Sequence, residues 1–187
     1  PVPFADQLFM ERVENQVIIP TINGLKKDGI DYKGFIFIGL MNVNSEPYVI
    51  EYNVRLGDPE TEVVMPRIAT DLVDLFEHVK NNTLSEADFE VYNNVATTVI
   101  AVSGGYPEDY ATNKKIVGLN ADRSNKQLVF HSGTKMDGQD VVSNGGRVLA
   151  CTGIGENIKD ALKNSYKSLD EISFDKMYFR KDIGFDL

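Results

Sequence analysis

The polar side chains best suited to chemistry lie in the run Glu51-Tyr52-Asn53-Val54-Arg55. Side chains alternate along a β-strand, so Glu51, Asn53 and Arg55 would share one face of a strand. Carboxylate and carboxamide oxygens are ligands that Mg²⁺ takes alongside phosphate oxygens and water. A guanidinium group can hold anionic oxygens with two parallel hydrogen bonds. The pattern indicates either a cation and phosphate site or a strand whose polar face lies in solvent.

Carboxylates follow directly after this run. Asp58, Glu60 and Glu62 are spaced two residues apart, and Gly57 and Pro59 among them favour a turn. This loop places further acidic groups close to the candidate cation site.

Glycine pairs mark two later loops, Gly104-Gly105 and Gly145-Gly146. Glycine lets backbone N–H groups approach a phosphate, so these loops could line a substrate, although tight turns explain the glycines equally well. Arg147 follows the second pair and could bind a phosphate or form an ion pair with one of the many acids.

A hairpin and two helices are predicted around the Glu51 strand. The mostly apolar run 33–41 and the run 48–55 predict two strands, and the turn residues between them favour a β-hairpin. Apolar residues recur every four positions from residue 4, predicting a helix that Pro20 interrupts or kinks. Residues 71–80 predict a second amphipathic helix, with Leu72, Leu75, Phe76 and Val79 on its apolar face.

The second half of the chain is rich in predicted strands. The predicted strands cover residues 89–102, 116–118, 127–131 and 147–152. Residues 157–169 predict a final amphipathic helix. We therefore expect an α+β fold with two parts, residues 1–83 and a small antiparallel β-rich domain over residues 84–187.

Composition narrows the class of protein. The 187 residues carry a formal net charge of −9, which argues against nonspecific binding to nucleic acid, and no apolar run approaches the length of a membrane span. The only cysteine, Cys151, lies in an apolar run and is expected to be a buried, inert thiol, and a reducing, cytoplasmic compartment is the simplest expectation. Because the chain begins at Pro1 without a methionine, we expect it to be a piece of a longer protein.

Several blocks of sequence together resemble phosphoribosylamine–glycine ligase, a member of the ATP-grasp superfamily. The blocks that carry the resemblance, in chain order, are residues 20–25, 32–41, 51–62, 104–107, 129–134, 145–149 and 179–184. The resemblance covers essentially the whole chain. It implies the second half of an ATP-grasp domain, made of an antiparallel hairpin and helices, followed by a β-rich C-terminal domain that closes the active site.

The resemblance also implies an activity. Members of this family phosphorylate the glycine carboxylate with ATP, and the amine of 5-phosphoribosylamine then attacks the acyl phosphate to give glycinamide ribonucleotide. The glycine-rich phosphate loop and the domain that holds phosphoribosylamine lie upstream in the family, so this chain alone is expected to be folded and inactive, with the missing N-terminal part as its partner.

Residue roles implied by the resemblance fall into four groups. Glu51 and Asn53 would hold Mg²⁺ or Mn²⁺, Arg55 and Asp58 would be catalytic, and Met41 and Ile50 would pack on the adenine of ATP or simply in the core. The substrate-binding residues would be Glu60, Gly105, Tyr106, Pro107, Gly146 and Arg147. Two alternatives stay open at this point: another ATP-grasp carboxylate–amine ligase, and a non-catalytic β-rich interaction module.

Overall fold

The computed structural model describes residues 2–187, which separate into two compact units. Unit 1 consists of residues 2–57 and 71–88 with Leu187, and unit 2 consists of residues 58–70 and 89–186. Each unit is therefore assembled from segments that are separate in the sequence. The chain passes from unit 1 to unit 2 between residues 88 and 89, close to the boundary predicted near residue 83. The division into 1–83 and 84–187 stays a prediction.

Unit 1 begins with one continuous helical stretch. Its successive parts are α1 (Gln7–Val13), a π-helical turn (Glu14–Ile18) and α2 (Ile19–Lys27). Pro20 lacks an N–H group and stands in the first turn of α2, where a helix does not need that donor. The helical stretch continues through Pro20, so the expected interruption is wrong, whereas the alternative, a kink, stays a prediction. The π-turn lies just before Pro20, with the Ile19 N–H donating to the Glu14 carbonyl.

A β-hairpin follows in unit 1. Its antiparallel strands are β1 (Phe37–Val43) and β2 (Glu46–Asn53). Glu51 pairs with Gly39 and Val49 pairs with Leu40, so Ile50 is an extra, bulged residue in β2. The hairpin is as predicted, but β2 ends two residues earlier than expected, before Arg55.

Helix α4 (Leu72–Asn81) completes unit 1 together with the short 3₁₀ helix Leu84–Glu86. The Asp71 side chain caps α4 by accepting a hydrogen bond from the Val73 N–H, and Asn82 ends it in the left-handed conformation. This confirms the predicted helix. Its Phe76 is 49% exposed and meets Phe35 edge to face.

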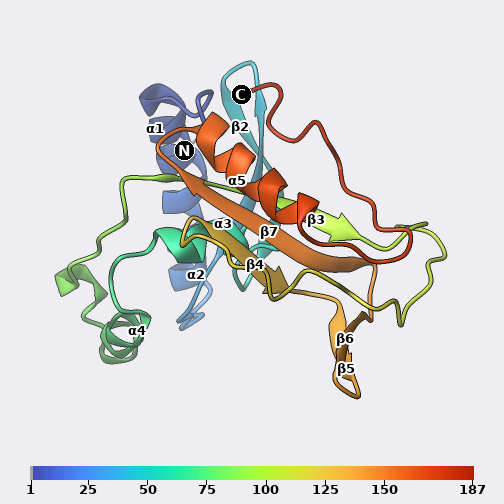
Figure 1. Ribbon diagram of the computed structural model, residues 1–187. Helices are drawn as coiled ribbons and strands as arrows, with labels where there is room; N and C mark the ends of the chain where they lie inside the picture. The colour runs from blue at the N-terminus through green and yellow to red at the C-terminus, as the bar shows by residue number, and fades with distance from the viewer. Residues whose placement is uncertain (1) are drawn as a thin grey trace. The chain divides into compact units, whose positions relative to one another are not determined.

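Unit 2 is a three-stranded antiparallel sheet covered on one face by a helix (Figure 1). The strand order is β3 (Val95–Val102), β7 (Arg147–Gly155), β4 (Gln127–His131), and the helix is α5 (Ile158–Asp170). A separate hairpin is formed by β5 (Thr134–Asp137) and β6 (Asp140–Ser143), and the short helices are α3 (Thr61–Val64) and η2 (Met65–Arg67). The predicted β-rich domain with one helix is confirmed.

The strand predictions in unit 2 were only partly correct. The predicted strand over residues 89–102 is shorter, because β3 begins at Val95. No strand forms over residues 116–118: Val117 makes an isolated bridge to Ser173, and the preceding Lys115 makes one to Val142. The β5–β6 hairpin was not predicted, although the Asp137-Gly138 dipeptide is a typical hairpin turn signal.

The core of unit 2 lies between the sheet and α5. Val99, Val148, Leu149, Cys151 and Leu169 are almost fully buried in it. Burial raises the pKa of the Cys151 thiol to about 12, so the expected buried and unreactive cysteine is confirmed.

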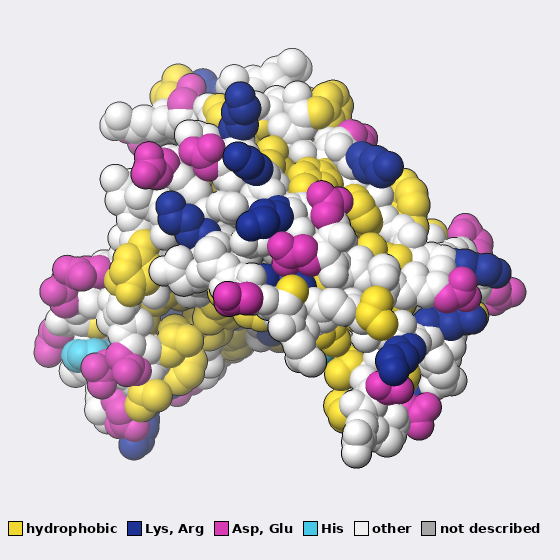
Figure 2. Space-filling model, viewed as in Figure 1, with side chains coloured by type: hydrophobic (Ala, Val, Ile, Leu, Met, Phe, Trp, Pro, Cys, Tyr) yellow, Lys and Arg dark blue, Asp and Glu magenta, His cyan; other side chains and the backbone are white. Residues whose placement is uncertain are grey.

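Two surface properties bear on the classes of protein considered above. No helix within the described residues 2–187 is long and apolar enough to cross a membrane. On the face shown in Figure 2, acidic side chains lie beside the basic ones.

Candidate functional site

The predicted cation ligands lie side by side on β2 in unit 1. The Asn53 amide group donates a hydrogen bond of 2.9 Å to Glu51 Oε1, so the two side chains share one face of the strand as expected. Gly39 lies opposite Glu51, and a Cβ there would come 3.1 Å from Glu51 Cγ. The glycine therefore leaves the space that the Glu51 side chain occupies.

The remaining predicted residues of unit 1 are all exposed. Arg55 lies beyond the end of β2 and donates to the adjacent Leu56 carbonyl at 3.0 Å, so it does not continue the strand face of Glu51 and Asn53. Met41 is 53% exposed and Ile50 63% exposed, which argues against ordinary core packing for either. Both side chains are free to contact a ligand.

Glu51 and Asn53 fit a hard cation, but as a partial ligand set. Both present oxygen atoms on a solvent-accessible strand, and Asn53 must rotate its carboxamide to turn Oδ1 toward a cation, because its amide nitrogen now faces Glu51. No group of three or more His, Cys, Asp or Glu side chains within residues 2–187 is arranged to hold a metal ion. The other ligands would therefore come from phosphate and water oxygens, as is usual for Mg²⁺.

In unit 2, an ion pair joins two of the predicted site residues. Arg147 Nη2 lies 2.9 Å from Asp58 Oδ2, and Arg147 Nη1 donates to the Asp58 carbonyl at 3.4 Å. Both side chains remain partly exposed, at 38% for Arg147 and 48% for Asp58. Of the two interpretations of Arg147, the ion pair with an acid is what the structure contains.

Hydrogen bonds from Ser103 join the two glycine loops next to Arg147. The Ser103 hydroxyl donates to the Gly145 carbonyl and the Ser103 N–H donates to the Gly146 carbonyl, both at 2.8 Å. The Tyr106 ring packs on Gly146, where a Cβ would fall 2.1 Å from a ring carbon. Close packing thus explains why position 146 is a glycine. At this position the structural explanation of the glycine loops holds.

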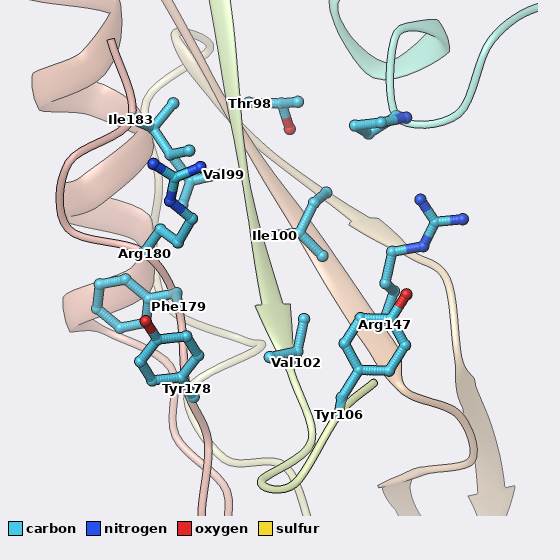
Figure 3. A pocket seen from close by; sticks show the side chains of 11 residues that line it. Thr98, Val99, Ile100, Val102, Tyr106, Arg147, Tyr178, Phe179, Arg180 and Ile183 are labelled. Carbon is cyan, nitrogen blue, oxygen red and sulfur yellow. The ribbon is translucent and has the colours of Figure 1, made fainter. Parts of the chain in front are cut away.

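A pocket of about 340 Å³ opens next to these loops (Figure 3). Side chains of β3 form its floor, Arg147 and Tyr106 lie on one side, and the C-terminal segment lies on the other. The lining residues are Pro59, Thr98, Val99, Ile100, Val102, Tyr106, Arg147, Tyr178, Phe179, Arg180 and Ile183. The pocket is therefore mainly apolar, with guanidinium groups at its sides.

Glu62 is a polar residue of this region to which sequence reasoning gave no role. One of its carboxylate oxygens is buried without a hydrogen-bond partner. Burial raises the pKa of Glu62 above its ordinary value of 4.5, and the negative charges of Asp58 and Glu60 also raise it, while its own backbone N–H and Arg147 lower it. The two-residue spacing of the acids at positions 58, 60 and 62 was its only signal in the sequence.

The raised pKa of Glu62 predicts a pH-dependent effect on stability. Between the ordinary and the raised value, the folded state binds more protons than the unfolded state, so stability falls as pH rises through this window. Glu62→Gln should therefore raise the melting temperature at pH 7 above that of the unsubstituted chain. The gain should disappear near pH 4 in thermal melts followed by circular dichroism.

The exposed Glu60 provides the control for this measurement. Glu60→Gln removes the same charge from the same loop and should raise the melting temperature at pH 7 less than Glu62→Gln does, because Glu60 is the smallest of the causes that raise the pKa of Glu62. An equal gain in both variants would mean that net charge, rather than the burial of Glu62, is responsible.

Comparisons with known proteins show which family the chain resembles. Residues 1–61 match the family model for the ATP-grasp (A) domain of phosphoribosylglycinamide synthetase, and residues 96–186 match the model for its C domain. A phosphoribosylamine–glycine ligase of Chlorobaculum tepidum is 42% identical over 98% of this chain, which spans 44% of that protein. A bifunctional purine biosynthetic protein of Dictyostelium discoideum is 42% identical over 94% of this chain, which spans 23% of its length.

A solved structure extends the likeness to the fold. The crystal structure of a phosphoribosylamine–glycine ligase from Thermotoga maritima matches 97% of this chain with a TM-score of 0.80 and 30% sequence identity, and the match covers 44% of that chain. The likeness thus runs through both units. The chain belongs to the phosphoribosylglycinamide synthetase family, with its first segment in the ATP-grasp domain of that family and its later segment in the C domain.

Proposed function

We propose that this chain is part of an ATP-dependent ligase that joins glycine to 5-phosphoribosylamine. The products would be glycinamide ribonucleotide, ADP and phosphate, formed through glycyl phosphate. The observation that carries the proposal is the Glu51–Asn53 oxygen pair, which lies in the segment that matches an ATP-grasp domain. The names of relatives about 40% identical to the chain, which are phosphoribosylamine–glycine ligases, support the choice of substrates.

Unit 1 would supply the nucleotide and cation side of the site. Glu51 and Asn53 would hold Mg²⁺ or Mn²⁺, and the cation would neutralise charge on the phosphates of ATP. Arg55 is exposed and donates to the adjacent Leu56 carbonyl, and its guanidinium would stabilise the transferring phosphoryl group. The exposed Met41 and Ile50 would pack on the adenine.

Unit 2 would supply the substrate side. Arg147 would bind the phosphate of phosphoribosylamine, and Gly105, Tyr106, Pro107 and Gly146 would shape the surrounding loop. We assign Glu60 to substrate binding and Asp58 to the catalytic groups. The support for this assignment is that the partly exposed Arg147 lies at the side of the pocket, where a guanidinium can bind an anion with two parallel hydrogen bonds.

The direct test of the function is ADP release by a full-length ligase of which this chain forms part. Release should require both glycine and phosphoribosylamine and a divalent cation. ADP release with a different acid or amine, and none with glycine and phosphoribosylamine, would assign the chain to another reaction.

Arg147→Ala in that ligase tests the substrate side. Loss of a charge-assisted contact of about 1.5–3 kcal/mol should raise KM for phosphoribosylamine roughly ten- to a hundredfold and leave KM for ATP and glycine nearly unchanged. Arg180→Ala is the matched control, because Arg180 lines the same pocket and, like Arg147, is paired with an aspartate, in its case Asp182 at 2.8 Å. If KM for phosphoribosylamine does not change in Arg147→Ala, Arg147 has only a structural role.

A further inference from the structure

The two terminal nitrogen atoms of the Arg147 guanidinium both meet one residue, Asp58. The Nη2 atom meets the Asp58 carboxylate at 2.9 Å and the Nη1 atom meets the Asp58 carbonyl at 3.4 Å. These are the two nitrogen atoms that would hold a phosphate with a pair of parallel hydrogen bonds. Asp58 and an incoming phosphate therefore cannot both occupy the same positions on Arg147.

The ion pair is open to exchange. Neither side chain is buried, so the pair receives little protection from solvent and contributes little to folding. An anion can reach Arg147 from the adjacent pocket, where the guanidinium stands at one side (Figure 3). The pocket volume of about 340 Å³ is in the range of small-molecule sites.

The charges around the Asp58–Arg147 ion pair favour its opening when a phosphate binds. Asp58 and Glu60 are both close enough to Glu62 for their negative charges to raise its pKa, and the positive charge of Arg147 acts on Glu62 in the opposite direction. A phosphate that joined this cluster with Asp58 still in place would meet three carboxylates. Displacing the Asp58 side chain from Arg147 reduces that repulsion.

We propose that Asp58 is an internal competitor at Arg147, and that a sugar phosphate monoester binds by displacing the Asp58 carboxylate. The choice of a sugar phosphate rests on the proposed function. Binding then releases the Asp58 side chain at the moment when the substrate arrives, so that the affinity for the phosphate is set by Asp58 as well as by Arg147.

The test uses this chain and ribose 5-phosphate as the probe, followed by isothermal titration calorimetry. Asp58→Asn keeps the size of the side chain and the backbone carbonyl but removes the competing charge. Its affinity for ribose 5-phosphate should be about tenfold higher than that of the unsubstituted chain, because one charge-assisted contact no longer has to be broken. Asp58→Asn combined with Arg147→Ala should abolish the gain.

Asp182→Asn is the matched control. It removes the same charge beside Arg180, the other arginine of the pocket, whose Nε and Nη2 atoms are held by Asp182 at 3.0 and 2.8 Å. Its affinity should stay within about twofold of the unsubstituted chain, since it leaves the pair at Arg147 intact. Melting curves of each variant verify that the chain remains folded, and Asp58→Ser supplies a second neutral side chain.

Two results would overturn the proposal. An equal gain in Asp58→Asn and Asp182→Asn would show a general effect of net charge, and an unchanged or weaker affinity in both Asp58→Asn and Asp58→Ser would show that Asp58 does not compete. The ligase assay is independent of these titrations. A tenfold gain here without glycine-dependent ADP release would reject the proposed function and leave the competition at Arg147 standing, whereas the reverse result would reject only the competition.

Discussion

Replacing Glu51 by glutamine in the full-length ligase should lower kcat at least about a hundredfold, the scale on which loss of one oriented electrostatic group is felt. Glutamine keeps the size of the side chain and one acceptor oxygen, but it removes the charge that offsets the cation. The melting temperature should hardly change, because Glu51 is exposed and its hydrogen bond from Asn53 can be kept by the glutamine carbonyl. Steady-state ADP release and a thermal melt measure the two effects.

Tyr52→Phe is the control on the same strand. The Tyr52 hydroxyl lies 2.9 Å from the Thr21 hydroxyl of α2, away from the face of Glu51, so its loss should cost about 0.5–1.5 kcal/mol of stability and spare turnover. If Glu51→Gln keeps near-normal turnover, or if it mainly unfolds the protein, the assignment of Glu51 as a cation ligand is wrong. The proposed function would then lose its main support.

Replacing Gly153 by alanine should destabilise unit 2 by at least about 3 kcal/mol, the upper part of the range for overpacked sites. A Cβ at this position of β7 would lie 2.1 Å from the Ala161 carbonyl oxygen and 2.4 Å from the Ser165 nitrogen of α5. Both are backbone atoms, so α5 would have to move away from the sheet. The midpoint of thermal unfolding should fall by roughly 6–12 °C.

The change should be localised as well as large. Amide hydrogen exchange should show lost protection in β7 and α5, because the Gly153 N–H now donates to the Ser165 hydroxyl at 2.9 Å inside that contact. Gly24→Ala is the matched control in α2, where a Cβ meets nothing within 4 Å. It should stabilise the protein slightly, by up to about 1 kcal/mol, since alanine is the better helix former. A fall of less than about 2 °C in Gly153→Ala would contradict the close packing.

Elements with strong local signals could be predicted from the sequence. Helix α5 begins where the Asn157 side chain accepts a hydrogen bond from the Asp160 N–H, and α4 begins at the equivalent cap Asp71. Strand β4 is found over the residues expected for it, Gln127–His131. In these cases the residues that cap an element or form it are neighbours in the sequence. The position of the element can therefore be predicted without knowing its contacts with distant segments.

Elements that depend on neighbours were predicted less well. The bulge at Ile50 changes which side chains of β2 share a face, and alternation along one strand carries no sign of it, because a bulge exists only relative to a partner strand. The π-turn before Pro20 is of the same kind, since its wider hydrogen bonds depend on how the whole helical stretch continues. The site residues Glu51 and Asn53 both follow the bulge in the sequence, so they still share one face of β2.

The sequence by itself determined the types of chemical group and the family to which they belong. A carboxylate and a carboxamide two residues apart on a strand must share a face, and the order of motifs along the chain indicated the phosphoribosylglycinamide synthetase family. The tertiary structure decided which acid Arg147 meets and which acid is buried. Asp58 reaches Arg147 across 89 positions of sequence, and Glu62 loses solvent that Glu60 keeps. Such contacts arise only when the loop before α3 and the start of β7 are brought together by packing, so no local pattern encodes them.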